Sequence, residues 1–283
     1  MAVETTTCFH HTDRPTGRTC TRCGRPACPD CLHQAAVGAH CFECVRAAQP
    51  PGQPRTRQRA LGTGGGWAAV PPVTKAIIVI NVAVFVLTAI SAGNISGEGG
   101  RVQAEIALFG PAIQYGEWWQ LYRLVTAGFL HFGLIHIAFN MVILYRFGEM
   151  LEPALGPVRF AGLYLASLLT GSFGALAMSP HAFTGGASGA VFGLVAAAAI
   201  GLHQRGINVW QSGVGGLIVV NLVLTFVVPG ISIGGHLGGL AGGFLAGAFM
   251  LRVPTTRRSV IDGVLVAGVI SALAVAGSAL VAR

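Results

Sequence analysis

Seven apolar runs follow one another between residues 76 and 282. Each run is long enough to cross the hydrocarbon core of a bilayer as a helix, which takes about 17–25 residues. Charged residues make up only 10% of the 283-residue chain and hydrophobic residues 53%, whereas soluble domains carry roughly 25% charged residues. This composition excludes an ordinary soluble enzyme and a disordered chain, and it predicts an all-α polytopic membrane protein. The expected spans are 76–92, 132–148, 158–178, 187–203, 213–229, 234–252 and 260–282.

Seven basic residues near the ends of the expected spans fall on one side of the membrane. The loops between spans three and four and between spans five and six contain no lysine or arginine. Because lysine and arginine concentrate in cytoplasmic loops, we expect a plasma-membrane protein with a cytoplasmic N-terminus and an external C-terminus. The net charge of +8 then reflects orientation in the bilayer, so no nucleic-acid partner is predicted. The cytoplasmic basic residues are Lys75, Arg146, Arg159, Arg205, Arg252, Arg257 and Arg258.

The stretch between the first two spans, residues 93–131, is too long and too mixed in composition to be a plain turn. It contains aromatic rings of the kind that gather at the headgroup level of a bilayer, namely Tyr115, Trp118, Trp119 and Tyr122. We therefore expect a partly embedded loop at the membrane surface.

A segment rich in proline and glycine separates the apolar runs from an N-terminal module. Ten of residues 46–72 are proline or glycine, a share typical of unstructured sequence. Such a segment cannot bury enough apolar surface to offset the entropy of ordering it. We predict three parts: a small module over 1–45, a flexible linker over 46–74 and a membrane domain over 75–283.

All seven cysteines lie in the N-terminal module, and together with one histidine they form four pairs with two residues between the partners. This spacing lets both side chains turn toward one ion, and zinc takes four such ligands in a tetrahedron. The odd cysteine count and the cytoplasmic location argue against a disulfide framework. Eight ligands make two closed sites without a position for water, so we predict two structural zinc ions. The ligands are Cys8, His11, Cys20, Cys23, Cys28, Cys31, Cys41 and Cys44, with His10, His33 and His40 as alternatives.

The four pairs resemble those of B-box-like cross-brace zinc domains. The resemblance implies that the first and third pairs share one ion and that the second and fourth share the other. The spacing alone does not fix this pairing. For a module of this kind we expect a cytoplasmic protein partner and a role in recruitment or regulation.

Three segments place polar side chains inside spans, where such residues are costly and become functional candidates. The segments are 131–140, 185–193 and 234–239, and the expected topology puts all three near the outer end of the membrane. His136 and Asn140 share one helix face, because they are four residues apart. Glycines flank both Ser188 and His236, so their helices can approach closely. A serine within hydrogen-bond reach of a histidine is an activated nucleophile.

A purely structural interpretation of these residues also exists. Serine is common in membrane helices and usually bonds its own backbone. The glycines could serve only close helix packing, and His136 with Asn140 could simply tie helices together.

The combination of motifs resembles the rhomboid family of intramembrane serine proteases. Gly186-Ala-Ser188-Gly189 fits the G-x-S-G of the family, and His131, His136 and Asn140 fit its H-x4-H-x3-N. The segment from Glu117 to Arg123 resembles the tryptophan–arginine signature of the first loop, with Tyr122 in place of the tryptophan. Phe192 matches an aromatic residue that the family packs against the histidine. His236, followed by Gly239, fits the histidine of the sixth span.

The resemblance implies a six-helix core with a seventh C-terminal span and a catalytic dyad. Ser188 would be the nucleophile and His236 the general base, while His136 and Asn140 would stabilise the oxyanion. Catalysis would need no cofactor. The implied substrates are single-pass transmembrane proteins in the lipid bilayer, cut near the outer membrane face and next to small residues.

Other protease classes fit poorly. An aspartyl intramembrane protease needs two acidic residues within spans, and a zinc protease needs H-E-x-x-H, whereas Ile137 follows His136 here. The main remaining alternative is a catalytically inactive rhomboid-like protein that binds membrane helices.

Overall fold

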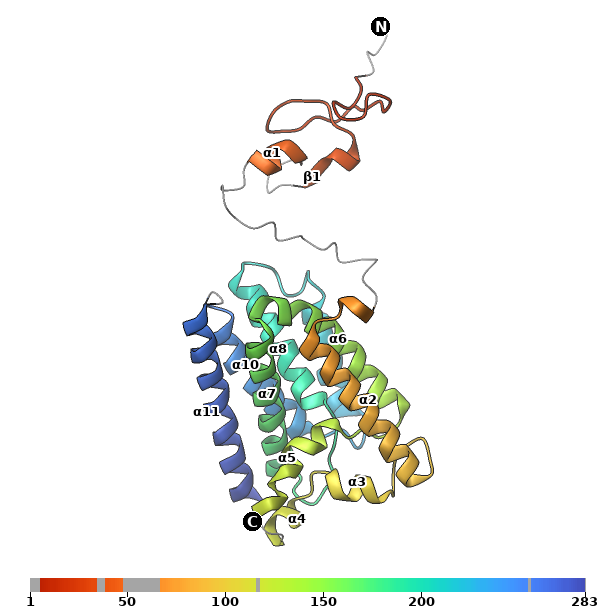
Figure 1. Ribbon diagram of the computed structural model, residues 1–283, viewed down its shortest axis with the longest axis vertical. Helices are drawn as coiled ribbons and strands as arrows, with labels where there is room; N and C mark the ends of the chain where they lie inside the picture. The colour runs from red at the N-terminus through yellow and green to blue at the C-terminus, as the bar shows by residue number, and fades with distance from the viewer. Residues whose placement is uncertain (1–5, 35–38, 48–66, 116–117, 254–255, 283) are drawn as a thin grey trace. The chain divides into compact units, whose positions relative to one another are not determined.

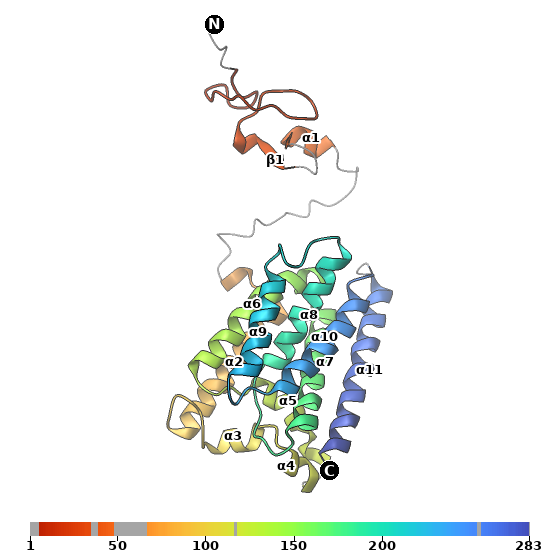
Figure 2. The ribbon, with the colours of Figure 1, turned by 180° about the vertical axis from the view of Figure 1, so that it is seen from behind.

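The computed structural model describes residues 6–34, 39–47, 67–115, 118–253 and 256–282 (Figures 1 and 2). The chain divides into two compact units, Met1–Gly64 and Gly65–Arg283. Most of the predicted linker, residues 48–66, lies outside the described residues.

The first unit is a small module built around thiol groups. It contains the 3-10 helix η1 (Pro29–Cys31), the antiparallel strands β1 (Leu32–Gln34) and β2 (Ala39–Cys41), and the helix α1 (Phe42–Ala47). Helix α1 runs past the predicted end of the module at residue 45. Cysteines dominate the small buried cluster, which consists of Cys8, Ala27, Cys28 and Cys31. Apolar burial of this size is too small to fold a domain by itself.

The second unit is a bundle of apolar helices. Five of its described helices are long and apolar enough to span a membrane: α2 (Pro72–Ala92), α6 (Leu134–Leu155), α7 (Pro157–Met178), α10 (Ile233–Met250) and α11 (Arg257–Val281). Two shorter apolar helices, α8 (Ser188–Gln204) and α9 (Val214–Val227), complete the set. The protein is therefore a multi-pass membrane protein. A helix corresponds to each expected span, and the count of seven spans stays a prediction because α8 and α9 are short.

Glycines let three of these helices pack almost backbone to backbone. A β-carbon on Gly171 of α7 would lie 3.2 Å from the Gly189 Cα of α8 and 3.1 Å from the Gly235 carbonyl oxygen of α10. Similarly, a β-carbon on Gly239 would collide with the Gly189 backbone, and one on Gly243 with that of Gly193. Small residues at such interfaces are typical of membrane helices, where close approach supplies the packing energy.

Short helices fill the segment that was expected to be an interfacial loop. They are α3 (Arg101–Ile106), α4 (Gly110–Tyr115), η3 (Trp118–Tyr122), α5 (Arg123–Thr126) and η4 (Ala127–Phe129). The segment is tied down by the buried Arg123, which donates to the carbonyl oxygens of Ala104 at 2.8 Å and Ala107 at 2.9 Å. Tyr122, which stands in place of the expected tryptophan, donates its hydroxyl to the Glu105 carbonyl at 2.8 Å. Glu117 lies outside the described residues.

A buried carboxylate holds the start of α2 against the end of α6. Glu152 accepts the backbone N–H groups of Val73 at 2.9 Å and Thr74 at 2.8 Å, and also the Thr74 hydroxyl at 2.7 Å. A carboxylate suits this position because the first backbone donors of a helix have no partner within the helix and carry partial positive charge.

The ends of the helices gather in two groups. At one end, Gln204 of α8 donates to the Ala248 carbonyl of α10, and the start of α11 packs against Arg159 of α7. The starts of α6, α8 and α10 meet at the other end. The three polar segments singled out from the sequence therefore converge within the second unit.

Candidate functional site

Ser188 and His236 each lie in the first turn of a helix, and the two helices touch at this point. Ser188 opens α8, and His236 is the fourth residue of α10. A β-carbon on Gly189 would lie 3.2 Å from the carbonyl oxygen of Gly235. The residues next to the predicted serine and histidine are thus in backbone contact, which a larger side chain at either position would prevent.

Phe192 fixes where the imidazole of His236 lies. Its ring stacks on that of His236 with the centroids 4.1 Å apart and the planes inclined by 21°. Phe192 follows Ser188 by four residues, so both side chains occupy one face of α8. The stacking expected from the family resemblance is present, and it holds the His236 ring over the face of α8 that carries Ser188.

The described residues contain no hydrogen bond between Ser188 and His236, although the glycine pattern of the two helices predicts that the pair lies within reach. His236 instead pairs through Nδ1 with the Thr225 hydroxyl of α9 at 2.7 Å. Hydrogen bonds between catalytic residues are often formed only when substrate is bound. Thr225 was not among the site residues predicted from the sequence. The one feature that could have indicated it is that Thr225 is a polar residue in an apolar span.

His136 faces the same region from α6. Its Nδ1 accepts the backbone N–H of Phe132 at 3.3 Å, so the neutral ring carries its proton on Nε2. A β-carbon on Gly186 would lie 2.9 Å from this Nε2 and 3.5 Å from the Ser188 hydroxyl oxygen. The space in front of both groups is therefore open only because residue 186 is glycine. Gly186 also has a φ of +138°, which other residues rarely adopt.

The other two members of the second-span motif have different surroundings. Asn140 is buried, and its amide donates to the His136 carbonyl one turn earlier at 2.9 Å. The amide group has a second hydrogen that this bond does not use. His131 is fully buried, and its Nε2 lies 3.5 Å from the backbone nitrogen of Ala187, next to Ser188. His131 therefore supports the turn into α8.

Comparison with known proteins agrees with the family resemblance of the sequence motifs. Residues 118–253 match the family model described as "Rhomboid domain". The chain is 35% identical over 181 residues to "Rhomboid protease GluP" of Bacillus subtilis, a match that covers 63% of this chain and 34% of that protein. It is 34% identical over 134 residues to "Putative rhomboid protease YdcA" of the same bacterium, covering 46% of this chain and 66% of the relative.

These matches support membership of the rhomboid family. "Rhomboid-type serine protease 2" of Emericella nidulans is a further relative, 31% identical over 150 residues, with 49% of this chain and 29% of that protein covered. The chain thus spans between 29% and 66% of the length of these relatives. The rhomboid domain match includes Ser188, His236, His136 and Asn140, while α2 and α11 lie outside it.

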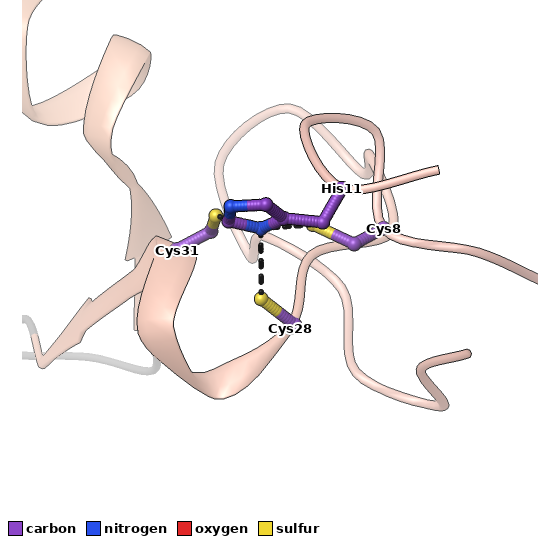
Figure 3. Close-up of side chains that lie close together, drawn as sticks. All are labelled: Cys8, His11, Cys28 and Cys31. Atoms are coloured by element: carbon purple, nitrogen blue, oxygen red, sulfur yellow. Dashed lines mark hydrogen bonds between the residues drawn. The ribbon is translucent and has the colours of Figure 1, made fainter. Parts of the chain in front are cut away.

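Outside the rhomboid domain, the first unit brings its cysteines together in two clusters. In the first cluster, His11 Nδ1 lies 3.9 Å from the sulfur of Cys8, 3.4 Å from that of Cys28 and 3.3 Å from that of Cys31 (Figure 3). In each cluster the ligand atoms all lie within 4.8 Å of one another, a spacing at which they could hold a metal ion. The second cluster consists of Cys20, Cys23, Cys41 and Cys44.

The grouping decides between alternatives that the spacing left open. The first pair lies with the third and the second with the fourth, as the resemblance to cross-brace domains implied. His11 belongs to the first cluster, while His10, His33 and His40 belong to neither among the described residues.

Thiols of the same cluster differ in pKa, because they lie close together and are surrounded by different groups. Burial opposes ionisation of Cys8, but hydrogen bonds from neighbouring backbone groups outweigh it and lower the pKa of this thiol to about 6. Burial and the nearby thiols of Cys28 and Cys8 raise the pKa of Cys31 to about 12. The same division holds in the second cluster, with a pKa of about 6 for Cys20 and about 12 for Cys44. The three thiols of the first cluster and the four of the second cannot all ionise alone, and a bound divalent cation would supply the charge that lets them do so.

Proposed function

We propose that the membrane unit is an intramembrane serine endopeptidase that uses Ser188 as nucleophile and His236 as general base. The observation that carries this proposal is the stacking of His236 on Phe192, which puts the imidazole on the Ser188 face of α8. The presence of His136 Nε2 in front of the same serine adds the donor that an acyl-transfer site needs. The similarity to rhomboid proteases supports the same class of reaction.

The reaction would proceed by acyl transfer. His236 takes the proton of the Ser188 hydroxyl through Nε2 while the serine oxygen bonds to the carbonyl carbon of the scissile peptide. The negative charge that develops on the carbonyl oxygen is held by His136 Nε2–H, the amide of Asn140 and the backbone N–H of Ser188. The C–N bond then breaks, and His236 returns the proton to the leaving amine. Water, deprotonated by His236, hydrolyses the resulting ester.

The substrates follow from the location of the site inside a membrane protein. We propose single-pass transmembrane proteins that are cut next to small residues, near the outer face of the plasma membrane. A membrane helix satisfies all its backbone groups internally, so the substrate has to unwind locally before Ser188 can attack. In this orientation the N-terminus is cytoplasmic and the C-terminus external, because seven of the ten lysine and arginine residues at 75–283, including Lys75 and Arg159, then face the cytoplasm.

For the N-terminal module we propose two structural zinc ions and a cytoplasmic protein partner. Three thiolates with one imidazole, and four thiolates, are donor sets typical of structural zinc. Four protein ligands complete the coordination of each ion, so neither ion offers a position for substrate. The module, over 1–45, would fold on zinc and act in recruitment or regulation.

The test of the catalytic proposal is covalent labelling by a serine-directed fluorophosphonate. The purified full-length protein in detergent is expected to be labelled, and also to cleave a reporter protein with a single transmembrane helix. Ser188→Ala should abolish both signals, and His236→Ala should do the same without loss of folded protein. Ser212→Ala is the control, because Ser212 is exposed in the loop before α9 and donates to the Val209 carbonyl. Labelling that persists in Ser188→Ala would refute the serine mechanism and favour the inactive, helix-binding alternative.

A further inference from the structure

Thr225 occupies an unusual position for a polar residue of an apolar helix. It lies in the last turn of α9 and only 2% of it is exposed. Half of the residues of α9 are exposed, and among its described residues only Val214, Gly215 and Thr225 are buried. A threonine in such a helix normally satisfies its hydroxyl on its own backbone, and Thr225 does so with the Asn221 carbonyl at 2.7 Å. The additional contact with His236 therefore needs a separate explanation.

The hydrogens can be assigned from the partners of the Thr225 hydroxyl. Its oxygen lies 2.7 Å from the Asn221 carbonyl oxygen and 2.7 Å from His236 Nδ1. A carbonyl oxygen can only accept, so the single hydroxyl hydrogen goes to Asn221. The Thr225 oxygen is then the acceptor toward His236, and His236 Nδ1 has to carry a hydrogen. A neutral imidazole protonated on Nδ1 has its lone pair on Nε2.

We propose that Thr225 is a positioning residue that holds His236 in the Nδ1–H tautomer. Phe192 fixes the plane of the ring by stacking, and Thr225 fixes which nitrogen bears the hydrogen. The Nε2 lone pair is thereby directed away from α9 and is available as the base. The tautomer assignment rests on geometry alone, whereas its catalytic consequence rests on the proposed function of Ser188 and His236.

The presence of threonine rather than valine at position 225 supports this assignment. Valine has nearly the same shape and would suit a buried position in an apolar helix, but it offers His236 no acceptor. A buried imidazole N–H without an acceptor costs free energy, so the ring would change its tautomer or turn about its side-chain bonds. Either change removes the base from Ser188.

The experiment compares Thr225→Val, Thr225→Ser and the wild-type protein. Thr88→Val is the matched control, because Thr88 is also a fully buried threonine that donates to its own helix, at the Phe85 carbonyl. Loss of an oriented general base should lower kcat by about tenfold to a hundredfold in Thr225→Val, since acid–base catalysis contributes about 10²–10⁴-fold. KM should not change. Thr225→Ser retains the acceptor and should remain within about threefold of wild type, as should Thr88→Val.

A spectroscopic measurement tests the tautomer without any reaction. Protein with ¹⁵N-labelled histidine should show His236 protonated on Nδ1 and unprotonated on Nε2 in the wild type and in Thr225→Ser. Thr225→Val should show a population with the hydrogen on Nε2. The proposal is overturned if wild-type His236 lacks the Nδ1 hydrogen, if Thr225→Val keeps the wild-type kcat, or if Thr225→Ser loses as much as Thr225→Val. A wild-type protein that neither cleaves nor labels would instead refute the proposed function, and the nitrogen spectrum would still decide the tautomer.

Discussion

The hydrogen-bond partners of His136 and His236 suit these two histidines to the opposite roles proposed for them. His136 Nδ1 accepts from the Phe132 backbone, which leaves a hydrogen on Nε2 for donation. His236 Nδ1 pairs with Thr225, which leaves a lone pair on Nε2 for accepting a proton. The His136 ring can thus donate a hydrogen bond to an oxyanion, and the His236 ring can accept a proton from a hydroxyl. Neither assignment requires a charged residue, which is consistent with the apolar surroundings and with the absence of an acidic third member in the predicted dyad.

Gly186 is the residue on which this arrangement depends most directly. In Gly186→Ala the new methyl group would lie 2.9 Å from His136 Nε2, in the space where a substrate oxygen would bind. We expect cleavage to fall by about 10²–10³-fold, as for loss of one oxyanion donor. Gly206→Ala is the control, because Gly206 also has a positive φ, of +70°, but meets nothing within 4 Å. Undiminished cleavage of a reporter substrate by Gly186→Ala would show that this space is not the oxyanion site.

At the level of helices, the distance between α8 and α10 is set by small residues. Gly239 faces the Gly189 backbone and Gly243 faces that of Gly193, so the two helices touch along most of their length. Because Phe192 and His236 extend from these helices, their separation also sets the stacking distance of 4.1 Å between the two rings. The glycine pattern therefore determines both the packing of these helices and the geometry of the proposed site.

Gly243→Ala tests this dependence. Its β-carbon would collide with the backbone of Gly193, and overpacking of this kind typically costs about 1–3 kcal/mol. Thermal unfolding of the purified protein in detergent should shift downward by roughly 2–4 °C per kcal/mol. Gly268→Ala in α11 is the matched change, because a β-carbon there meets nothing within 4 Å, and it should leave the transition unchanged or raise it slightly. A Gly243→Ala protein as stable as wild type would mean that α8 and α10 can separate freely.

The sequence predicted the helices better than the contacts between them. Periodic apolar runs placed α8 and α9 to within two residues at either end, because Gly, Ser and Pro punctuate them. The short helices between 93 and 131 have too few turns to show a period, so they were expected as a loop. Thr225 could not be singled out, since its partner His236 belongs to another helix and nothing in the spacing reports which helices face each other. For the same reason the grouping of the cysteine pairs came only from a resemblance.

At the scale of the whole molecule, two units obtain their stability from different sources. The membrane unit buries a long apolar core and close glycine contacts between helices. Among its described residues, the buried core of the first unit consists of Ala27 and five cysteines, namely Cys8, Cys20, Cys28, Cys31 and Cys41. In the proposed zinc module, metal binding would therefore supply the folding free energy. In the proposed arrangement, four protein ligands surround each ion and leave no position for a substrate. The two units can therefore be separated by experiment.

Metal content provides the last prediction. The full-length protein should contain about two zinc ions per chain. His11→Ala removes a ligand whose Nδ1 lies 3.3–3.9 Å from three sulfurs, and it should lower the content to about one ion under competition from a chelator. His10→Ala should leave two, because the neighbouring His10 belongs to neither cluster.

Deletion of residues 1–60 should remove both ions, because all eight ligands lie within that segment, and should leave cleavage of a detergent-solubilised reporter largely intact. The reason is that Ser188, His236 and the groups that orient them all belong to the second unit. A truncated protein that stays folded in the membrane but no longer cuts the reporter would show that the zinc module takes a direct part in the reaction. Equal zinc content in the His10→Ala and His11→Ala proteins would contradict the assignment of His11 as a ligand.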